Sequence, residues 1–231
     1  MRRLPAVLSL LILFSSGAAA QMRLEALRAD LGVIYVPNLD PNKEPPDLIT
    51  YVLGAGLILP FAPDSAWSFE PSADVYTNYY ELDPLGRAVP TTVEERSAFV
   101  LGMIVDTPIA FSFRFGEGKK WRLGLGAGLG FDLRVGFLAA PEGEPDLGAI
   151  NSYFWKEGRF FMPSTFLRGE YKLTEMADFG FAVRAYWPIF NFWADEGLPF
   201  MDQSITCVSL GIRYKVEARS PRPSPDDPVS P

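Results

Sequence analysis

The sequence contains no histidine and a single cysteine, Cys207. Without histidine the chain cannot build Ser-His-Asp or Cys-His catalytic sites, and it lacks the imidazole ligands of the common zinc sites. One cysteine cannot form an intrachain disulfide, so the fold must be held together in another way. We therefore expect a protein that is not an enzyme and that carries no cofactor or metal.

Basic charge is also scarce, because 28 acidic residues outnumber 21 basic ones and leave a formal net charge of −7. A surface that binds nucleic acid has to be basic, so this balance argues against nucleic acid as a partner. After residue 20 the sequence has no long uninterrupted apolar run. This absence excludes a transmembrane helix from the predicted fold.

Residues 1–20 have the pattern of a signal peptide. Arg2 and Arg3 precede an apolar stretch, 4–14, that is too short to span a bilayer as a helix, and residues 18–20 are alanines that suit a cleavage site. Residues 21–216 should then form one domain. Residues 217–231, rich in proline, should be a disordered or extended tail on the periplasmic side.

Apolar and small or charged residues alternate with a period of two along most of the predicted domain. Between residues 121 and 137 every odd position is apolar, while the even positions hold only glycine, arginine and aspartate. Successive side chains of a strand point to opposite faces, so the pattern predicts a strand with one apolar face. The same pattern predicts eight strands, at 27–35, 51–61, 67–79, 99–115, 121–137, 161–173, 179–189 and 208–216.

The connections between these strands alternate between long and short. Long ones fall near 37–48, 81–96, 139–158 and 193–202, and short ones near 62–65, 116–120 and 174–177. Short turns at one rim and long loops at the other are typical of outer-membrane barrels. The predicted fold class is therefore all-β, an eight-stranded antiparallel up-and-down transmembrane β-barrel.

The alternation separates two faces without saying which one lies inside. A soluble lipocalin-like barrel that binds lipid would place the apolar face inward. However, an eight-stranded barrel has little interior room, and the apolar set is bulky. Aromatic residues also gather near both ends of the strands, as expected of the girdles at two membrane interfaces. We therefore expect the apolar face to lie outside, against lipid.

The last strand carries the pattern of an outer-membrane assembly signal, with Ser209, Gly211, Tyr214 and Val216 at its fixed positions. On this pattern and the eight alternating strands, the chain resembles the small outer-membrane barrels of the OmpA, OmpX and OmpW kind. The resemblance implies a place in the cell outer membrane, contact with its lipids, and recognition by the outer-membrane insertion machinery. Val216 departs from the family pattern, in which an aromatic residue is usual.

The even positions contain acidic and basic residues in near balance, and buried charges are tolerable when they are paired. We expect them to form an ion-pair network that fills the lumen, although they could instead line a pore. The predicted network consists of Arg28, Asp30, Glu70, Asp74, Asp106, Arg114, Arg122, Asp132, Arg134, Arg168, Glu170, Arg184 and Arg213. Gly124, Gly126, Gly128 and Gly130 lack the spacing of a nucleotide-binding loop, and steric relief in a curved wall explains them better.

The long loops are acidic, and they also carry a group of aromatic residues. Glu142, Glu144 and Asp146 could bind calcium, although solvated loop charge is the simpler explanation. An apolar ligand path is conceivable along Phe154, Trp155, Phe190, Phe192, Trp193 and Phe200. Interfacial anchoring would explain the same six residues.

These features favour a non-enzymatic outer-membrane barrel with a charge-filled lumen, acidic surface loops and a structural role in the cell envelope. An OmpW-like channel for small hydrophobic molecules is the alternative that the resemblance allows. An adhesin that binds host surface molecules would need only the exposed loops.

Overall fold

The computed structural model describes residues 23–39, 47–91, 97–139, 146–194 and 197–216. The predicted signal peptide and the predicted tail lie outside these residues. The strands are β1 (Ala26–Val36), β2 (Leu48–Pro60), β3 (Trp67–Phe69), β4 (Ser72–Leu82), β5 (Ala88–Thr91), β6 (Ala98–Asp106), β7 (Ile109–Phe115), β8 (Trp121–Ala139), β9 (Phe161–Lys172), β10 (Ala177–Tyr186) and β11 (Ile205–Lys215).

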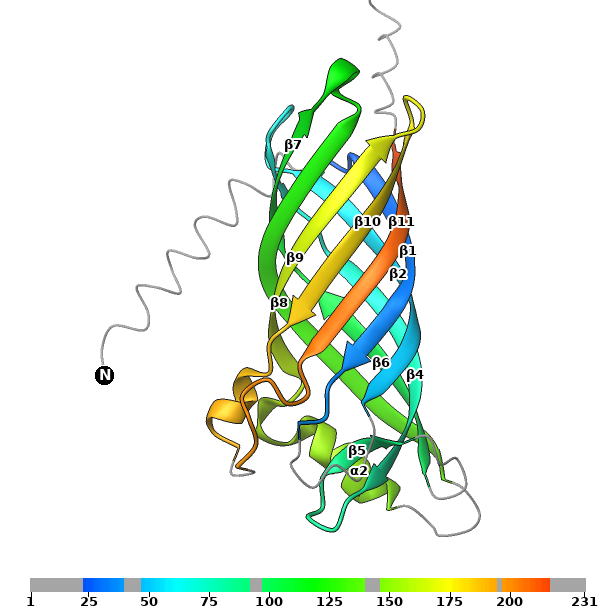
Figure 1. Ribbon diagram of the computed structural model, residues 1–231, viewed down its shortest axis with the longest axis vertical. Coiled ribbons are helices and arrows are strands. Elements are labelled where there is room, and N and C mark those ends of the chain that lie inside the picture. The colour runs from blue at the N-terminus through cyan, green and yellow to red at the C-terminus, as the bar shows by residue number, and fades with distance from the viewer. Residues whose placement is uncertain (1–22, 40–46, 92–96, 140–145, 195–196, 217–231) are drawn as a thin grey trace, which may run out of the picture.

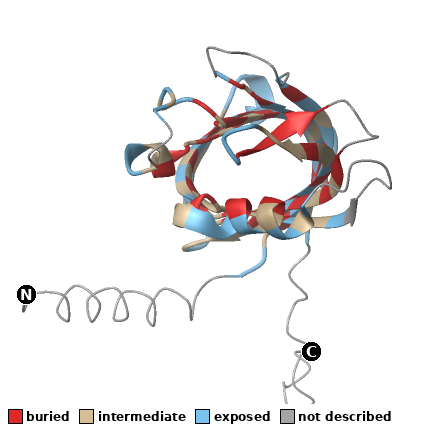
Figure 2. Ribbon diagram, turned by 90° about the horizontal axis from the view of Figure 1, so that it is seen from below, coloured by how far each residue is buried: buried red, intermediate tan, exposed pale blue. Residues whose placement is uncertain are grey.

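The strands form a closed antiparallel barrel. β3 and β4 are two parts of the third barrel strand, β6 and β7 are two parts of the fourth, and β5 is a side hairpin on β4, which leaves eight strands around the ring. The first strand pairs with the last, with Ala26 opposite Lys215, so the ring has no open edge (Figure 2). The predicted eight-stranded up-and-down barrel is confirmed.

The two ends of the barrel differ in the length of their connections, as predicted. The turns β2–β3, β7–β8 and β9–β10 lie at one end, together with both ends of the described chain (Figure 1). The other connections lie at the opposite end and carry β5, the helix α2 (Leu147–Trp155) and two short 3-10 segments, η3 (Lys156–Gly158) and η4 (Ile189–Phe192). We call these the short-turn end and the long-loop end.

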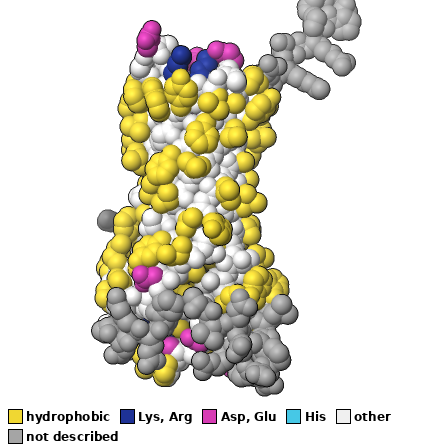
Figure 3. Space-filling model, turned by 45° about the vertical axis from the view of Figure 1, so that its right-hand side comes forward, with side chains coloured by type: hydrophobic (Ala, Val, Ile, Leu, Met, Phe, Trp, Pro, Cys, Tyr) yellow, Lys and Arg dark blue, Asp and Glu magenta, His cyan; other side chains and the backbone are white. Residues whose placement is uncertain are grey.

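The apolar face of the strands points outward. Ile49, Tyr51, Leu53 and Leu31 are 70%, 79%, 66% and 63% exposed, whereas Val52 and Asp30, which are adjacent in sequence, are buried in the lumen. Figure 3 shows one side of the barrel, on which hydrophobic side chains cover the wall and charged ones lie toward its ends. The arrangement is the reverse of a soluble lipocalin-like barrel.

Two predicted strands are interrupted in the middle. The third breaks at Glu70 and Pro71, and the fourth at Thr107 and Pro108. Proline has no amide hydrogen to donate to a ladder, and the two breaks lie side by side, where Glu70 N donates to Pro108 O over 3.0 Å. The register is the same on both sides of each break, so the alternation in the sequence runs through without a shift.

The long-loop end differs most from the sequence prediction. The strand predicted to reach residue 189 ends at Tyr186, because Pro188 follows and Ile189 begins η4. The link after β8, expected as a loop, contains α2, whose first turn is capped by Asp146 accepting a hydrogen bond from Ala149 N over 2.9 Å. Within the described part of the chain, no helix combines the length and the apolarity needed to cross a bilayer.

The backbone at the break in the fourth strand packs closely against a glycine of β8, Gly128. A Cβ atom at Gly128 would lie 2.4 Å from Pro108 Cα and 2.9 Å from the carbonyl carbon of Thr107, both backbone atoms that a rotamer change cannot move. We expect Gly128→Ala to destabilise the barrel by about 1–3 kcal/mol, the usual cost of overpacking. Urea unfolding of protein refolded into lipid vesicles measures this change.

The control for this substitution is Gly169→Ala. A Cβ atom at Gly169 would meet no atom within 4 Å, so this variant should unfold at the same urea concentration as the parent protein. Equal midpoints for the two variants would contradict the close contact at Gly128.

Candidate functional site

The lumen holds the main group of charged side chains. Alternation places them on the inward face of successive strands, and the described side chains of Glu70, Asp74, Arg168, Glu170 and Arg184 are each at most 3% exposed. Their burial is extreme for charged groups, which are rarely buried without partners. The contacts of these charged side chains therefore decide whether they fill the lumen or line a pore.

Arg168 on β9 is the centre of the network. Its guanidinium donates two hydrogen bonds to the Glu70 carboxylate, at 2.6 and 3.0 Å, and its Nε lies 2.9 Å from Glu170 Oε1. Ser68 Oγ donates to the same Glu70 carboxylate over 2.9 Å. Bidentate pairing of this kind fixes both partners in one geometry. Arg168 thus ties the third barrel strand to the sixth across the lumen.

The pairs continue without a gap on both sides of Arg168. On one side, Arg28 Nη1 lies 3.7 Å from Glu70 Oε2 and its Nε lies 2.7 Å from Asp30 Oδ2. Arg184 then lies 3.8 Å from Asp30 and donates to both oxygens of Asp74. Cation and anion therefore alternate from the centre of the lumen to Asp74.

On the other side of Arg168, the network reaches the short-turn end. Glu170 lies 3.4 Å from Arg213 Nη1 and 3.8 Å from Arg122 Nε. Arg213 also donates to Glu25, a residue that the sequence prediction did not include. Glu25 precedes β1, where strand alternation no longer indicates a face, so no sequence signal was available for it.

The remaining predicted members lie in smaller groups. Asp106 accepts a hydrogen bond from Ser164 Oγ over 2.6 Å, and Asp132 pairs with Arg134 at 3.1 Å. Arg114 pairs at 2.6 Å with Asp178, which is fully buried and which the sequence prediction also omitted. Asp178 keeps the inward parity of β10, so extending that strand by one residue from Phe179 would have found it.

Glycines on β8 receive large side chains from neighbouring strands. A Cβ atom at Gly126 would lie 2.4 Å from the Phe166 ring, and one at Gly130 would lie 2.7 Å from the Tyr186 ring. Both rings lie on the inward face, where the lumen of a small barrel leaves little space. The glycine run therefore provides steric relief, and here the relief accommodates aromatic side chains.

Toward the long-loop end the lumen becomes apolar, which the sequence analysis did not predict. A buried cluster there consists of Ile34, Val36, Leu48, Val52, Tyr76, Ile104, Met162, Tyr186, Ile205 and Cys207. Tyr76 joins this cluster to the charges, because its hydroxyl donates to Asp132 over 2.9 Å. We call this cluster the apolar plug.

The helix α2 packs at the long-loop end of the barrel, against residues on the inward face of the strands. Its Ile150, Tyr153 and Phe154 pack against β4, β5 and β6 in a second buried cluster. The Arg134 guanidinium lies 4.4 Å from the centre of the Phe154 ring, so the charged lumen and the helix are in direct contact. We call α2 together with the residues of this second cluster the cap.

The six aromatic residues of the predicted ligand path are divided between two environments. Phe154 and Phe190 are 1% exposed and belong to the packed interior, whereas Phe192 and Trp193 are 74% and 54% exposed. Trp155 is half-exposed and lies 5.6 Å from the Phe160 ring, and Phe200 stacks on Phe192 at 4.6 Å. The exposed members therefore form two surface pairs or lie singly, which suits interfacial anchoring.

The other predicted sites are placed as follows. Of the assembly-signal residues, Ser209 is buried in the lumen, Gly211 packs against Asp30, Tyr214 is half-exposed on the outer face, and Val216 follows β11. Of the calcium candidates, Asp146 caps α2, and Glu142 and Glu144 lie outside the described residues. The described residues contain no group of three or more Asp, Glu, Cys or His side chains arranged to hold a metal ion.

The chain is similar in structure to solved outer-membrane barrels. It matches the Neisserial surface protein NspA with 12% identity and a TM-score of 0.51, over 83% of this chain and 96% of that one. It matches the outer-membrane protein OprG of Pseudomonas aeruginosa with 13% identity and a TM-score of 0.50, over 85% of this chain and 99% of that one. No family model and no curated protein sequence matches the chain significantly. The structural matches confirm the fold that the resemblance to small outer-membrane barrels predicted.

Proposed function

We propose that this chain is a closed, non-enzymatic barrel of the cell outer membrane, with a structural role in the envelope. A bilayer needs strands of about 9–11 residues to cross its hydrocarbon core, and β1 and β11 each have 11 residues. The outward apolar face supports contact with lipid. Closure of the ring leaves no unpaired edge among its eight described strands, and lipid would penalise such an edge strongly.

The observation that carries the structural role is the filling of the lumen. The void that remains among Arg28, Asp30, Arg168, Glu170 and Arg213 measures about 10 Å³, the space of one water molecule at most. Beyond it, toward the long-loop end, lies the apolar plug. An aqueous pore would require both regions to open, and each would lose contacts that bury its side chains.

We expect the purified full chain to produce no stable conductance steps in planar lipid bilayers, because ions would have to displace buried ion pairs. The sample should first be shown to be folded by a shift in gel mobility between unboiled and boiled protein. Stepwise, reproducible conductance from heat-modifiable protein would refute the closed barrel.

The same filling weighs against the channel for small hydrophobic molecules. Such a channel would use Trp155 and Trp193, which are exposed on the surface, and would lead past the buried Phe154 and Phe190. If cells that carry W155A and W193A lost uptake of an apolar solute while keeping normal barrel levels, the channel would be favoured over the closed barrel. An adhesive role of the long loops is compatible with a closed barrel and would add to it.

A further inference from the structure

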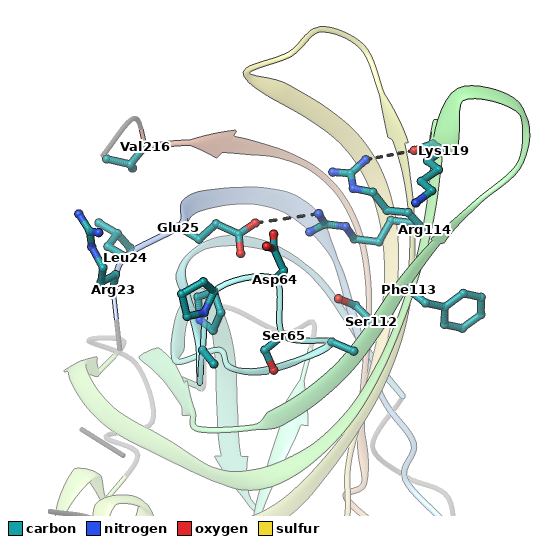
Figure 4. Close-up of a pocket in the computed structure, with 15 residues that line it drawn as sticks. Arg23, Leu24, Glu25, Asp64, Ser65, Ser112, Phe113, Arg114, Lys119 and Val216 are labelled. Atoms are coloured by element: carbon teal, nitrogen blue, oxygen red, sulfur yellow. Dashed lines mark hydrogen bonds and ion pairs between the residues drawn. The ribbon is translucent and has the colours of Figure 1, made fainter. Parts of the chain in front are cut away.

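The two ends of the barrel expose different kinds of side chain. At the short-turn end, a cavity of about 670 Å³ is lined in part by charged residues that already have partners (Figure 4). Among them, Arg114 pairs with Asp178 and Glu25 pairs with Arg213. The long-loop end instead exposes aromatic rings on the connection between β10 and β11, and the closed barrel does not use them.

This connection has few charged residues. Residues 185–194 and 197–201 contain no Asp, Glu, Lys or Arg, and only Asp195 and Glu196 separate the two stretches. Such a segment has little to gain from water.

The most exposed side chains of the connection lie together. Phe192 and Trp193 are 74% and 54% exposed, and Met201 is 41% exposed. Phe192 stacks on Phe200, with the ring centres 4.6 Å apart. Exposed apolar side chains that form one patch mark a surface for lipid or for another apolar partner. We call Phe192, Trp193, Phe200 and Met201 the η4 patch.

Hydrogen bonds hold the backbone of the η4 patch in place. Asn191 Nδ2 donates to Phe200 O over 3.1 Å and to Asp202 O over 2.8 Å, so the two halves of the connection are tied together. Trp193 Nε1 donates to Glu157 O over 2.7 Å, which keeps the indole ring beside η3. The exposure of the rings, which water disfavours, is therefore part of the fold.

The η4 patch lies beside the barrel and not over its mouth. Figure 1 and Figure 2 show η4 outside the ring of strands, at the level where β10 ends, whereas the β4–β5 hairpin continues along the barrel axis. Trp187, two positions before η4, donates from Nε1 to Thr165 Oγ1 on the outer face of β9 over 3.2 Å. The apolar wall of the barrel therefore continues into the η4 patch.

We propose that the η4 patch lies in the bilayer interface on the long-loop side, where it binds lipid at the boundary between headgroups and acyl chains. The inference rests on the proposed place of the chain in a membrane, because it extends the lipid contact of the wall to this connection. Trp and Phe rings are favoured at this depth. With Asn191 and the Trp193 indole nitrogen bonded within the protein, the patch offers lipid an apolar surface. The patch then fixes the depth and tilt of the barrel on one side.

Spin labelling of the full chain in phospholipid vesicles tests the proposal. Single labels are attached at F192C in the η4 patch, at L85C in the β4–β5 turn and at L31C on the wall. Leu85 is the matched control, because it is apolar, lies at the same end and is 74% exposed, as Phe192 is. Cys207 is 1% exposed, so the parent chain should take up no label. The measured quantity is the ratio of collisions with oxygen, which enters lipid, to collisions with a water-soluble nickel complex.

We expect this ratio to be roughly threefold higher at residue 192 than at residue 85, because interfacial segments lie inside the headgroup boundary. Each labelled variant is first shown to be folded by its heat-dependent gel mobility. A ratio at residue 192 no higher than at residue 85, with a lipid-like ratio at residue 31, would overturn this inference and leave the membrane barrel intact. Water-like ratios at residues 31 and 192 would overturn the proposed function as well. Spin–spin broadening at residue 192 that disappears on dilution with unlabelled protein would assign the η4 patch to a second copy of the chain, and would also overturn the inference.

Discussion

Replacing Arg168 by alanine is expected to destabilise the folded barrel by about 3–5 kcal/mol, the cost of breaking a buried ion pair from one side. Arg168 holds both oxygens of Glu70, and its Nε lies 2.9 Å from Glu170. Both carboxylates are at most 3% exposed, so water cannot replace the lost partner without entering the lumen. Equilibrium unfolding by urea in lipid vesicles gives the free energy of unfolding.

Lys172→Ala is the matched control, because it removes a cation from the same strand, β9. Lys172 donates to the exposed Glu175 at 2.6 and 2.7 Å, and these hydrogen bonds lower the pKa of the Glu175 carboxyl. Since Glu175 is fully exposed, water solvates it when Lys172 is removed, and we expect no measurable change in stability. Equal destabilisation by the two substitutions would show that the lumen network contributes no more than a surface pair.

A second comparison separates the cost of an unpaired charge from the value of the pair. In the double variant E70L/R168M both charges are replaced by apolar groups, while Glu170 keeps its contact with Arg213 at 3.4 Å. Replacement of a complete buried pair is often neutral in free energy. We therefore expect the double variant to be more stable than R168A, and a double variant that is less stable would contradict this account.

The barrel itself could be predicted from the sequence, because a strand in lipid obeys one simple constraint. Alternate residues face the bilayer, so the outward positions from Leu123 to Phe137 have to be apolar along the whole strand. Prolines such as Pro71 and Pro108 leave this parity unchanged when they interrupt the ladder. The number of strands, their order and the outward face therefore followed from alternation, the connection lengths and the bulk of the apolar set.

The apolar plug and the cap could not be predicted in the same way. Alternation assigns Ile104 and Tyr186 to the inward face, but it does not say at what height in the lumen each one lies or what it meets there. The answer depends on the stagger between neighbouring strands, which only the paired structure shows. Residues 98–106 are also apolar on both faces over most of their length, so they carried little information about their inner contacts.

Alternation in the sequence does not predict the structure of the long-loop end, because its segments pack on one another and not on lipid. The link after β8 has no period of two and therefore predicts a loop, although Asp146 is a suitable N-cap residue three positions before Ala149. The contacts that hold α2 come from residues far away in the sequence, such as Tyr80, whose ring lies 5.1 Å from the Phe154 ring. Local patterns could not indicate them.

One residue joins the two large loops of this end, and its removal should have a large local effect. The Arg159 side chain is 1% exposed and lies 4.3 Å from the Tyr153 ring of α2 and 5.1 Å from the Phe190 ring of η4. Its guanidinium also donates to Glu157 Oε2 over 2.6 Å. A desolvated cation–π contact contributes about 2 kcal/mol, and Arg159 makes two of them as well as an ion pair.

We expect Arg159→Ala to increase amide hydrogen exchange in α2 and η4 by roughly a hundredfold, equivalent to about 3 kcal/mol of local stability. Exchange in the barrel strands should stay unchanged, because their ladders do not involve Arg159. Lys156→Ala is the control, since Lys156 is 64% exposed and pairs at 3.2 Å with the same Glu157 carboxylate. If K156A accelerated exchange as much as R159A, the ion pairs to the Glu157 carboxylate, and not the contacts of Arg159 with the two rings, would hold the loops. If R159A also accelerated exchange in the strands, the cap would be part of the barrel's cooperative unit, and its loops could not move while the barrel stays closed.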